Sequence, residues 1–249
     1  MFNQQKKNLE TIEEELTSLS RNVHNQNVIS EHLDYIKALA KRNIPTQIIK
    51  EILNDNKTLE AIAARSYEHV NHFDKIVLVD NKDPQGFRLT LHSWNCNYGK
   101  DIPDEELIHN HRFSFWSHIL RGNLIAENFS EAKPFSIERK TFNKYIYRPS
   151  TTGNIHTCSF QEKAQLNKIE EVIKPQGETY YLKFDTIHRI LLPQSGTNLC
   201  TFVLRGPRER EYTNTYNTFY PDRGINSNVP MMQPDQLKGK LTKILGEYA

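Results

Sequence analysis

Two histidines separated by one residue, His109 and His111, precede a strand-like apolar run in this chain of 249 residues. Side chains at alternate positions of a strand share a face, so we expect both imidazoles to point the same way. A third histidine, His188, lies much later, in the short run Ile187–Ile190. Three neutral imidazoles on one side of a first-row metal leave positions for a substrate and O₂, which favours catalysis over a closed structural site.

The surroundings of the pair decide between a ligand set and a chance occurrence, since the chain has ten histidines. A polar loop, residues 97–106, precedes the pair, and the following strand ends at Arg121 and Gly122. This order resembles the first motif of the cupin proteins, in which a loop delivers His-x-His and a glycine turn closes a hairpin. The resemblance implies a small β-barrel with the metal at its mouth.

A closer resemblance is to the cysteine dioxygenase family, and it covers about residues 45–210. It rests on Leu89–Trp94, on the histidine pair, on Leu120–Leu124 and on Ile187–Ile190, in that order. The family has a cupin barrel in which three histidines hold Fe(II). The resemblance therefore implies Fe(II) as the cofactor and His109, His111 and His188 as its ligands. No acid lies near Phe115 or Trp116, where many other cupins place a glutamate ligand.

The sequence departs from this family beyond the metal ligands. Thiol dioxygenases carry Ser-x-His-x-Tyr on a late strand, and the matching stretch here has Val203 for the histidine and Arg205 for the tyrosine. The cysteine that animal-type members cross-link to that tyrosine is replaced by Phe115 or Trp116. The altered surroundings put a thiol substrate in doubt.

Arg205, His92 and Trp94 are the residues predicted to shape the substrate pocket. Arg205 suits a carboxylate because its planar fork donates hydrogen bonds in pairs. His92 falls where the family has an apolar pocket residue, and Arg88 shares its face of the strand. Arg88 either binds a ligand carboxylate or points outward, and the sequence favours neither. Lys75 lies near the position of the family's substrate-carboxylate arginine.

Composition limits the cellular setting and the partners. The formal net charge of +2, with 25% charged residues, indicates neither a nucleic-acid binder nor an acidic tail. Three cysteines, an odd number, argue against a disulfide framework and for a reducing compartment. The first residues lack the apolar core of a signal peptide, and no apolar run is long enough to span a membrane. We expect a cytoplasmic protein whose partners are a small amino-acid-like substrate and O₂.

The expected fold class is α+β and mainly β, with a helical N-terminal region (1–74), a cupin barrel (75–210) and a C-terminal extension with a short helix (211–249). Helices are predicted over 9–19, 28–42, 46–53 (capped by Thr46), 59–67 (capped by Thr58) and 234–245. Strands are predicted over 75–79, 87–94, 113–120, 144–147, 178–184, 189–192 and 200–204. The polar segment 150–171 is expected to be an insertion.

Four further residues have a less specific interpretation. Cys96 is expected to be a buried or solvated thiol, and His118 a packed or surface side chain rather than a fourth ligand. Arg112 and Arg189 each follow a ligand, so strand alternation predicts that both point away from the metal into structural salt bridges.

The function predicted from these observations is a non-haem Fe(II) oxygenase acting on a small amino acid or related carboxylic acid. Three alternatives stay open at this stage. The protein could be an ordinary thiol dioxygenase, a cupin that uses Zn²⁺ or Mn²⁺ without redox chemistry, or a cupin that only binds a small acid.

Overall fold

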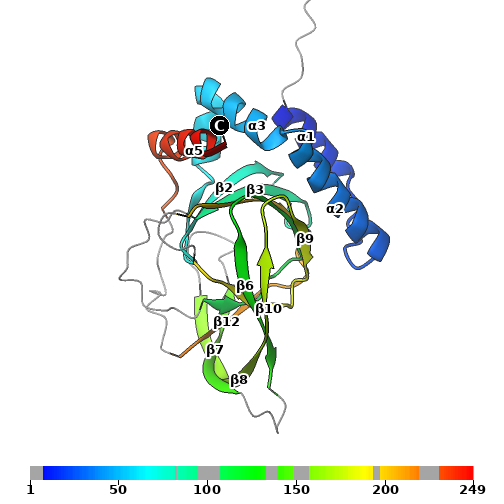
Figure 1. Cartoon of the computed structure of the whole chain (residues 1–249), viewed down its shortest axis with the longest axis vertical. Coiled ribbons are helices and arrows are strands. Elements are labelled where there is room, and N and C mark those ends of the chain that lie inside the picture. The colour runs from blue at the N-terminus through cyan, green and yellow to red at the C-terminus, as the bar shows by residue number, and fades with distance from the viewer. Residues whose placement is uncertain are drawn as a thin grey trace, which may run out of the picture.

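The computed structural model describes residues 8–81, 83–94, 107–132, 139–148, 157–192, 197–218 and 230–248. The helices of this described part gather at one end of the molecule, over strands β2 and β3 (Figure 1). Their bounds are α1 (Asn8–Ser18), α2 (Gln26–Lys41), α3 (Ile44–Asn54), α4 (Asn56–Ala63) and α5 (Pro234–Tyr248).

The strands form two antiparallel sheets, which confirms the predicted fold class of a mainly β protein with a helical N-terminal region. Sheet A has the order β1-β2-β3-β11-β5-β9, and the second sheet closes as β10-β4-β12-β7-β8-β6. The bounds are β1 (Tyr67–His69), β2 (Phe73–Asp80), β3 (Arg88–Trp94), β4 (Ile108–His109), β5 (Phe115–Arg121), β6 (Leu124–Glu131), β7 (Lys140–Arg148), β8 (Thr157–Lys174), β9 (Thr179–Leu182), β10 (Ile187–Ile190), β11 (Leu199–Arg205) and β12 (Thr213–Asn217).

Sheet A has two buried faces of different character. Leu89 and Leu91 of β3 belong to the apolar core that the sheet shares with the helices. Thr90 and His92, the alternate residues, line a cavity between the two sheets. Strand β11 repeats this pattern with Phe202 in the core. Period-two alternation therefore separates the face that packs on the helices from the face that lines the cavity.

Two predicted helix caps are wrong. The residue before α3 is Asn43, and Pro45 lies in the first helical turn, where its missing N–H leaves no bond unmade. Thr46 instead donates its hydroxyl to Asn43 Oδ1 at 3.1 Å. Asp55 caps α4 by accepting from the backbone N–H of Lys57, and Thr58 donates to the other carboxylate oxygen at 2.9 Å. In both cases the residue three positions upstream takes the N-cap position, but only Asp55 accepts a capping hydrogen bond with its side chain.

The expected polar insertion at 150–171 is also wrong over its described part. Residues Thr157–Lys174 form one 18-residue strand, β8, which pairs with both β6 and β7. Only Ala164 and Leu166 of this strand are buried, so it lacks the alternating apolar pattern that announces a half-buried strand. Backbone hydrogen bonds to the two neighbouring strands hold β8 in place instead. Residues 150–156 lie outside the described residues.

The C-terminal helix and the first strands are tied together. Helix α5 packs against α3 and α4, and Lys240 of α5 pairs with the buried Asp74 of β2 at 2.7 Å.

Strand β12 lies beyond residue 210 and pairs with β4 and β7. No helix in the described ranges is long and apolar enough to cross a membrane.

A buried histidine lies where α2 meets sheet A. His32 is 1% exposed, and its ring stands edge-on to Phe87 and Trp116 with centroids 5.1 and 4.6 Å away. Neither ring nitrogen has a hydrogen-bond partner among the described residues. Burial lowers the pKa of His32 to about 4, so the folded protein holds this imidazole neutral.

We predict that His32→Leu reduces the acid sensitivity of folding. Between pH 6.5 and about 4 the unfolded chain binds a proton that the folded chain refuses, so stability falls as the pH is lowered. One such group costs about 1.4 kcal/mol per pH unit within that window. Urea unfolding at pH 7.5 and pH 5 should show a smaller loss for His32→Leu than for the wild type. The exposed His24, changed to Gln, serves as the control and should keep the wild-type loss.

Candidate metal centre

The structure brings the three predicted ligands together. His109 ends β4 and lies directly opposite His188 of β10 in the antiparallel register. His111 follows in the loop, and its Nε2 is 2.8 Å from Nε2 of His188. One ligand nitrogen from each of the three rings lies within 4.8 Å of the others, so the group could hold a metal ion.

The convergence does not arise from alternation along one strand, as the sequence analysis expected. Strand β4 ends at His109, and β5 begins at Phe115 in the other sheet. His111 therefore lies in the crossing between the two sheets. Asn110 fixes the start of this crossing, since its N–H donates to Asn214 O at 3.1 Å and its Oδ1 accepts from Asn214 N at 2.8 Å.

Hydrogen bonding and burial set the imidazoles in the form that binds metal. Nδ1 of His109 lies 2.7 Å from the carbonyl oxygen of Leu107, which can only accept, so Nδ1 carries the hydrogen and Nε2 keeps its lone pair. Leu107 has φ 33°, an uncommon backbone conformation beside the site. Burial holds the pKa of His111 and of His188 well below its ordinary value, and His109 lowers both further. All three rings are thus suited to coordination.

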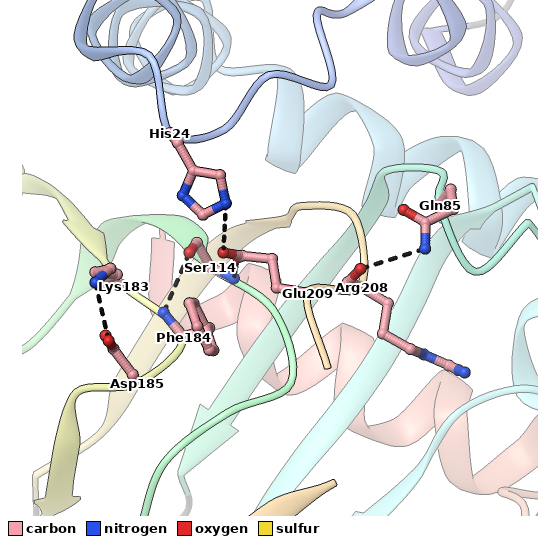
Figure 2. A network of polar contacts seen from close by, with 8 residues as sticks. All are labelled: His24, Gln85, Ser114, Lys183, Phe184, Asp185, Arg208 and Glu209. Atoms are coloured by element: carbon pink, nitrogen blue, oxygen red, sulfur yellow. Dashed lines mark hydrogen bonds and ion pairs between the residues drawn. The ribbon is translucent and has the colours of Figure 1, made fainter. Parts of the chain in front are cut away.

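A segment about one hundred residues away in sequence holds the ligand loop. Arg210 donates through Nε to the carbonyl oxygen of His111 at 2.7 Å, and its guanidinium also donates to Asn110 Oδ1. Glu209 accepts from the backbone N–H of Ser114 at 2.6 Å. Figure 2 shows Ser114 between Glu209 and Phe184, whose N–H donates to the serine hydroxyl at 3.1 Å. These bonds position His111 from outside the metal site.

The histidines open into a cavity of about 210 Å³ between the two sheets. All three predicted pocket residues, His92, Trp94 and Arg205, line it. His92 packs against Phe73 with ring centroids 4.6 Å apart, and its Nε2 lies 3.1 Å from the Thr90 hydroxyl. Burial, followed by the charge of Lys75, holds the pKa of His92 well below its ordinary value. The catalytic roles of these residues stay predictions.

Arg205 is the most buried cation of the cavity, with 7% of its surface exposed. It donates to the carbonyl oxygen of Gly86 and lies over the ring of Phe113, with 5.3 Å from Cζ to the centroid. Burial lowers its pKa to about 9, and Arg88 lowers it further, yet Arg205 stays charged at neutral pH.

The other arginines divide into two groups. Arg88 lines the cavity, and Asp80 of the neighbouring strand supplies its carboxylate partner at 2.7 Å. Arg189 makes the predicted structural salt bridge, with Glu127 at 2.6 Å. Arg112 also lines the cavity, so its predicted orientation is wrong. The reason is local: Arg112 lies in the crossing loop, where strand alternation does not apply.

His118 and Cys96 have different outcomes. His118 is buried, and its Nδ1 lies 2.7 Å from the Thr179 hydroxyl, so the prediction of a packed side chain is confirmed. Cys96 lies outside the described residues.

The cavity also has lining residues that sequence reasoning did not assign to it. Tyr180 lies on the predicted strand 178–184, so alternation could have found it, whereas the resemblance had already placed Lys75 of β2 near a substrate-binding position. Asn71 comes from the β1–β2 turn, and its amide nitrogen lies 3.4 Å from Nε2 of His109. Nothing in the sequence placed that turn beside the metal centre. Tyr67 and Tyr147 also line the cavity.

The donor set tests which metals fit. It consists of three imidazoles, and the described cavity lining contains no Asp or Glu. Imidazole ligands suit Fe, Zn, Cu and Ni, whereas Mg²⁺ and Ca²⁺ prefer oxygen. Three protein ligands leave positions on the metal that face the cavity. The residues therefore fit a transition metal at an open site.

No protein-family model and no curated protein sequence matches the chain. Among solved structures, hydroxypropylphosphonic acid epoxidase from S. wedmorenis matches with a TM-score of 0.32 and 9% identity over 56% of this chain and 53% of that one. A hydroquinone 1,2-dioxygenase in complex with Cd²⁺ and 4-hydroxybenzonitrile matches with a TM-score of 0.31 and 11% identity over 53% and 62%. DMSP lyases match with a TM-score of 0.29 and 12% identity over 54% and 47%. The chain spans about half the length of the first of these structures, and TM-scores this low carry no functional argument.

We predict that His188→Ala removes most of the bound metal, because it deletes the buried member of the triad. Protein purified anaerobically and analysed by elemental mass spectrometry should fall from about one transition-metal ion per chain towards none. His118→Gln, another buried histidine, is the control and should keep wild-type metal content. Equal metal content in His188→Ala and the wild type would contradict this assignment.

Arg210→Met is predicted to weaken metal binding although Arg210 is not itself a ligand. It removes the bonds that hold the His111 carbonyl and the Asn110 side chain, and such outer-shell changes cost about 10–100-fold in affinity. Competition with a chelator measures the change. Arg208→Met is the matched control from the same segment, since Arg208 pairs with Glu211 instead. An unchanged metal affinity in Arg210→Met shows that the loop holds its shape without this bond.

Proposed function

We propose that the protein is a non-haem Fe(II)-dependent cupin oxygenase that uses O₂ to oxidise a small carboxylic acid, either an amino acid or a related acid. The observation that carries the proposal is the set of three converging imidazoles that face a cavity lined by cations. The resemblance of Leu89–Trp94, the histidine pair and Ile187–Ile190 to the cysteine dioxygenase family supports iron as the metal.

Iron at this centre would supply Lewis acidity and the redox chemistry that O₂ requires. The chain's own residues would bind and orient the substrate. Arg205 offers a planar pair of donors to a carboxylate. Phe73, Trp94 and Phe115 give the cavity apolar surfaces that exclude water from the reacting atoms. His92, held neutral by burial, can donate or accept one hydrogen bond.

The cavity differs from the pocket expected of an ordinary thiol dioxygenase. Val203 and Arg205 both line it, at the positions that match the histidine and tyrosine of the thiol-specific pattern. Arg205 therefore brings a cation where that family has a phenol. A cationic pocket suits a substrate with an anionic group better than a small thiolate already bound through sulfur.

A metal-dependent cupin without redox chemistry is the second candidate. Three imidazoles also suit Zn²⁺, and the donor set does not distinguish it from Fe(II). Metal analysis after anaerobic purification separates the two candidates. If the purified protein contains Zn²⁺ and is fully active with it, the non-redox cupin replaces the oxygenase proposal.

Oxygen-electrode assays test the proposed reaction. With Fe(II)-loaded protein, we expect O₂ consumption with a non-thiol acid and a much lower kcat/KM for cysteine and 3-mercaptopropionate. Unpaired buried polar groups can discriminate between substrates by about 10⁴-fold. His188→Ala is the control for metal-dependent turnover. Fast, tightly coupled formation of cysteine sulfinate would return this chain to the ordinary thiol dioxygenases.

A further inference from the structure

The cavity carries more positive charge than one carboxylate requires. Its described lining contains Lys75, Arg88, Arg112 and Arg205 but no acidic residue. Asp80, just outside the lining, forms an ion pair with Arg88 at 2.7 Å, and its charge also favours the charged forms of Lys75 and Arg205 without forming an ion pair with either. Three cations are left facing the same space.

Arg205 is held against another cation. In the register of β3 and β11 it lies directly opposite Arg88, and like charges in such cross-strand pairs destabilise a sheet. The side chain is more than nine-tenths buried, and its Nε has no hydrogen-bond partner among the described residues. A buried, incompletely bonded guanidinium is costly unless a ligand completes it.

Lys75 faces the cavity from β2, opposite His92 of β3. Its ammonium makes no hydrogen bond or ion pair with a residue that the structure describes, and it lies 6.0 Å from the centroid of the Tyr67 ring. Burial lowers the pKa of Lys75 to about 7, and the neighbouring arginines lower it further. This amine is thus half-charged near neutral pH and ready to take up a proton.

Arg112 reaches the cavity from the crossing loop after His111. No carboxylate in the described ranges forms an ion pair with it. Three elements, β2, β11 and this loop, therefore each contribute one cation without a carboxylate partner in those ranges.

We propose that Lys75, Arg112 and Arg205 bind a substrate that carries two negative charges, such as a dicarboxylate or a phosphonate. The inference rests on the proposed function: it narrows the carboxylic acids of that proposal to dicarboxylates and adds phosphonates that can carry the same charge. A single carboxylate would leave at least one of the three cations buried without a partner. An α-amino acid would also bring an ammonium group into a cationic space. A dianion without an ammonium group pairs with more of the buried cations and adds no further positive charge to the cavity.

Calorimetric titration of the Fe(II)-loaded full chain, kept anaerobic, tests the proposal with matched probes. Succinate and butyrate share a four-carbon chain and differ by one carboxylate. Methylphosphonate, which loses its second proton just above neutral pH, can place two charges on one phosphorus atom. We expect a dianion to bind at least about tenfold more tightly than butyrate, a difference of about 1.4 kcal/mol. Comparison of succinate with methylphosphonate then tells which kind of anionic group fits.

Charge-removing variants show whether the selectivity arises in the cavity. Lys75→Met should remove most of the preference for dianions, whereas Lys75→Arg should keep part of it. Lys163→Met removes one charge from an exposed position of β8 and should change nothing. Succinate, methylphosphonate and butyrate binding equally, none of the dianions binding at millimolar concentration, or Lys75→Met keeping the full preference would each overturn the proposal.

Proton uptake provides a second readout that a merely structural lysine would not give. Succinate is fully ionised at pH 7, so its binding should raise the fraction of charged Lys75 and draw a proton from the buffer. The groups facing Lys75 are Tyr67 from β1, Asp80 from β2, Arg88 and His92 from β3, His111 and Arg112 from the crossing loop and Arg205 from β11. Titration in buffers of different ionisation enthalpy should show uptake in the wild type and none in Lys75→Met.

The outcomes also separate this inference from the oxygenase proposal. Oxygen consumption with monoanionic acids, together with no selectivity for dianions, refutes the dianion site and keeps the oxygenase. If dianions bind in a Lys75-dependent manner but no metal supports oxygen consumption, the dianion site is kept and the oxygenase proposal is refuted.

Discussion

The two-sided burial of sheet A is the constraint on which the rest of the structure depends. Its central strands have no solvent-facing side, because helices cover one face and the second sheet covers the other. Alternate residues must therefore satisfy two different environments. Leu89 and Leu91 build the apolar core, while Thr90 and His92 between them face the cavity. A slip of one residue in register would exchange the two sets, placing polar groups in the core and leucines at the metal centre.

The metal centre depends on a second constraint, which is the crossing from β4 to β5. One ligand lies before this crossing, one lies within it, and the third comes from β10 in the closed sheet. Residues 110–114 have no strand partner, so hydrogen bonds from two other segments fix their geometry. Arg210, Glu209 and Asn214 supply bonds from the segment after β11, and the carbonyl oxygen of Phe184 accepts from the His111 N–H at 2.8 Å. The strand that brings Arg205 to the cavity thus leads directly into residues that hold His111.

Sequence reasoning reached those features that depend on local periodicity. The cavity face of β3 follows from period-two alternation, and the helices follow from their apolar faces. The three candidate ligands came from the resemblance of their motifs to a known family, because alternation does not apply to His111 in its loop. It failed where long-range pairing outweighs local pattern. Strand β8 exposes most of its side chains and is held by two neighbours that no local signal reveals. Arg112 entered the cavity because its loop does not obey alternation, and the β1–β2 turn with Asn71 came beside His109 only through the closure of the fold.

Burial lowers the pKa of the basic side chains that line the cavity, and this has two consequences. It keeps His111 and His188 neutral, as ligands must be, and it makes the charge of Lys75 conditional on what the cavity holds. A divalent ion bound by three uncharged imidazoles would keep its full charge, because no carboxylate in the described lining offsets it. Metal and cavity cations would then repel one another, and an anionic substrate would relieve both repulsions at once. By linkage, the metal should strengthen the binding of the anion by the same factor as the anion strengthens that of the metal. On the proposal of a dianionic substrate, the free energy that this cationic wall costs in the empty protein would be recovered when the substrate binds.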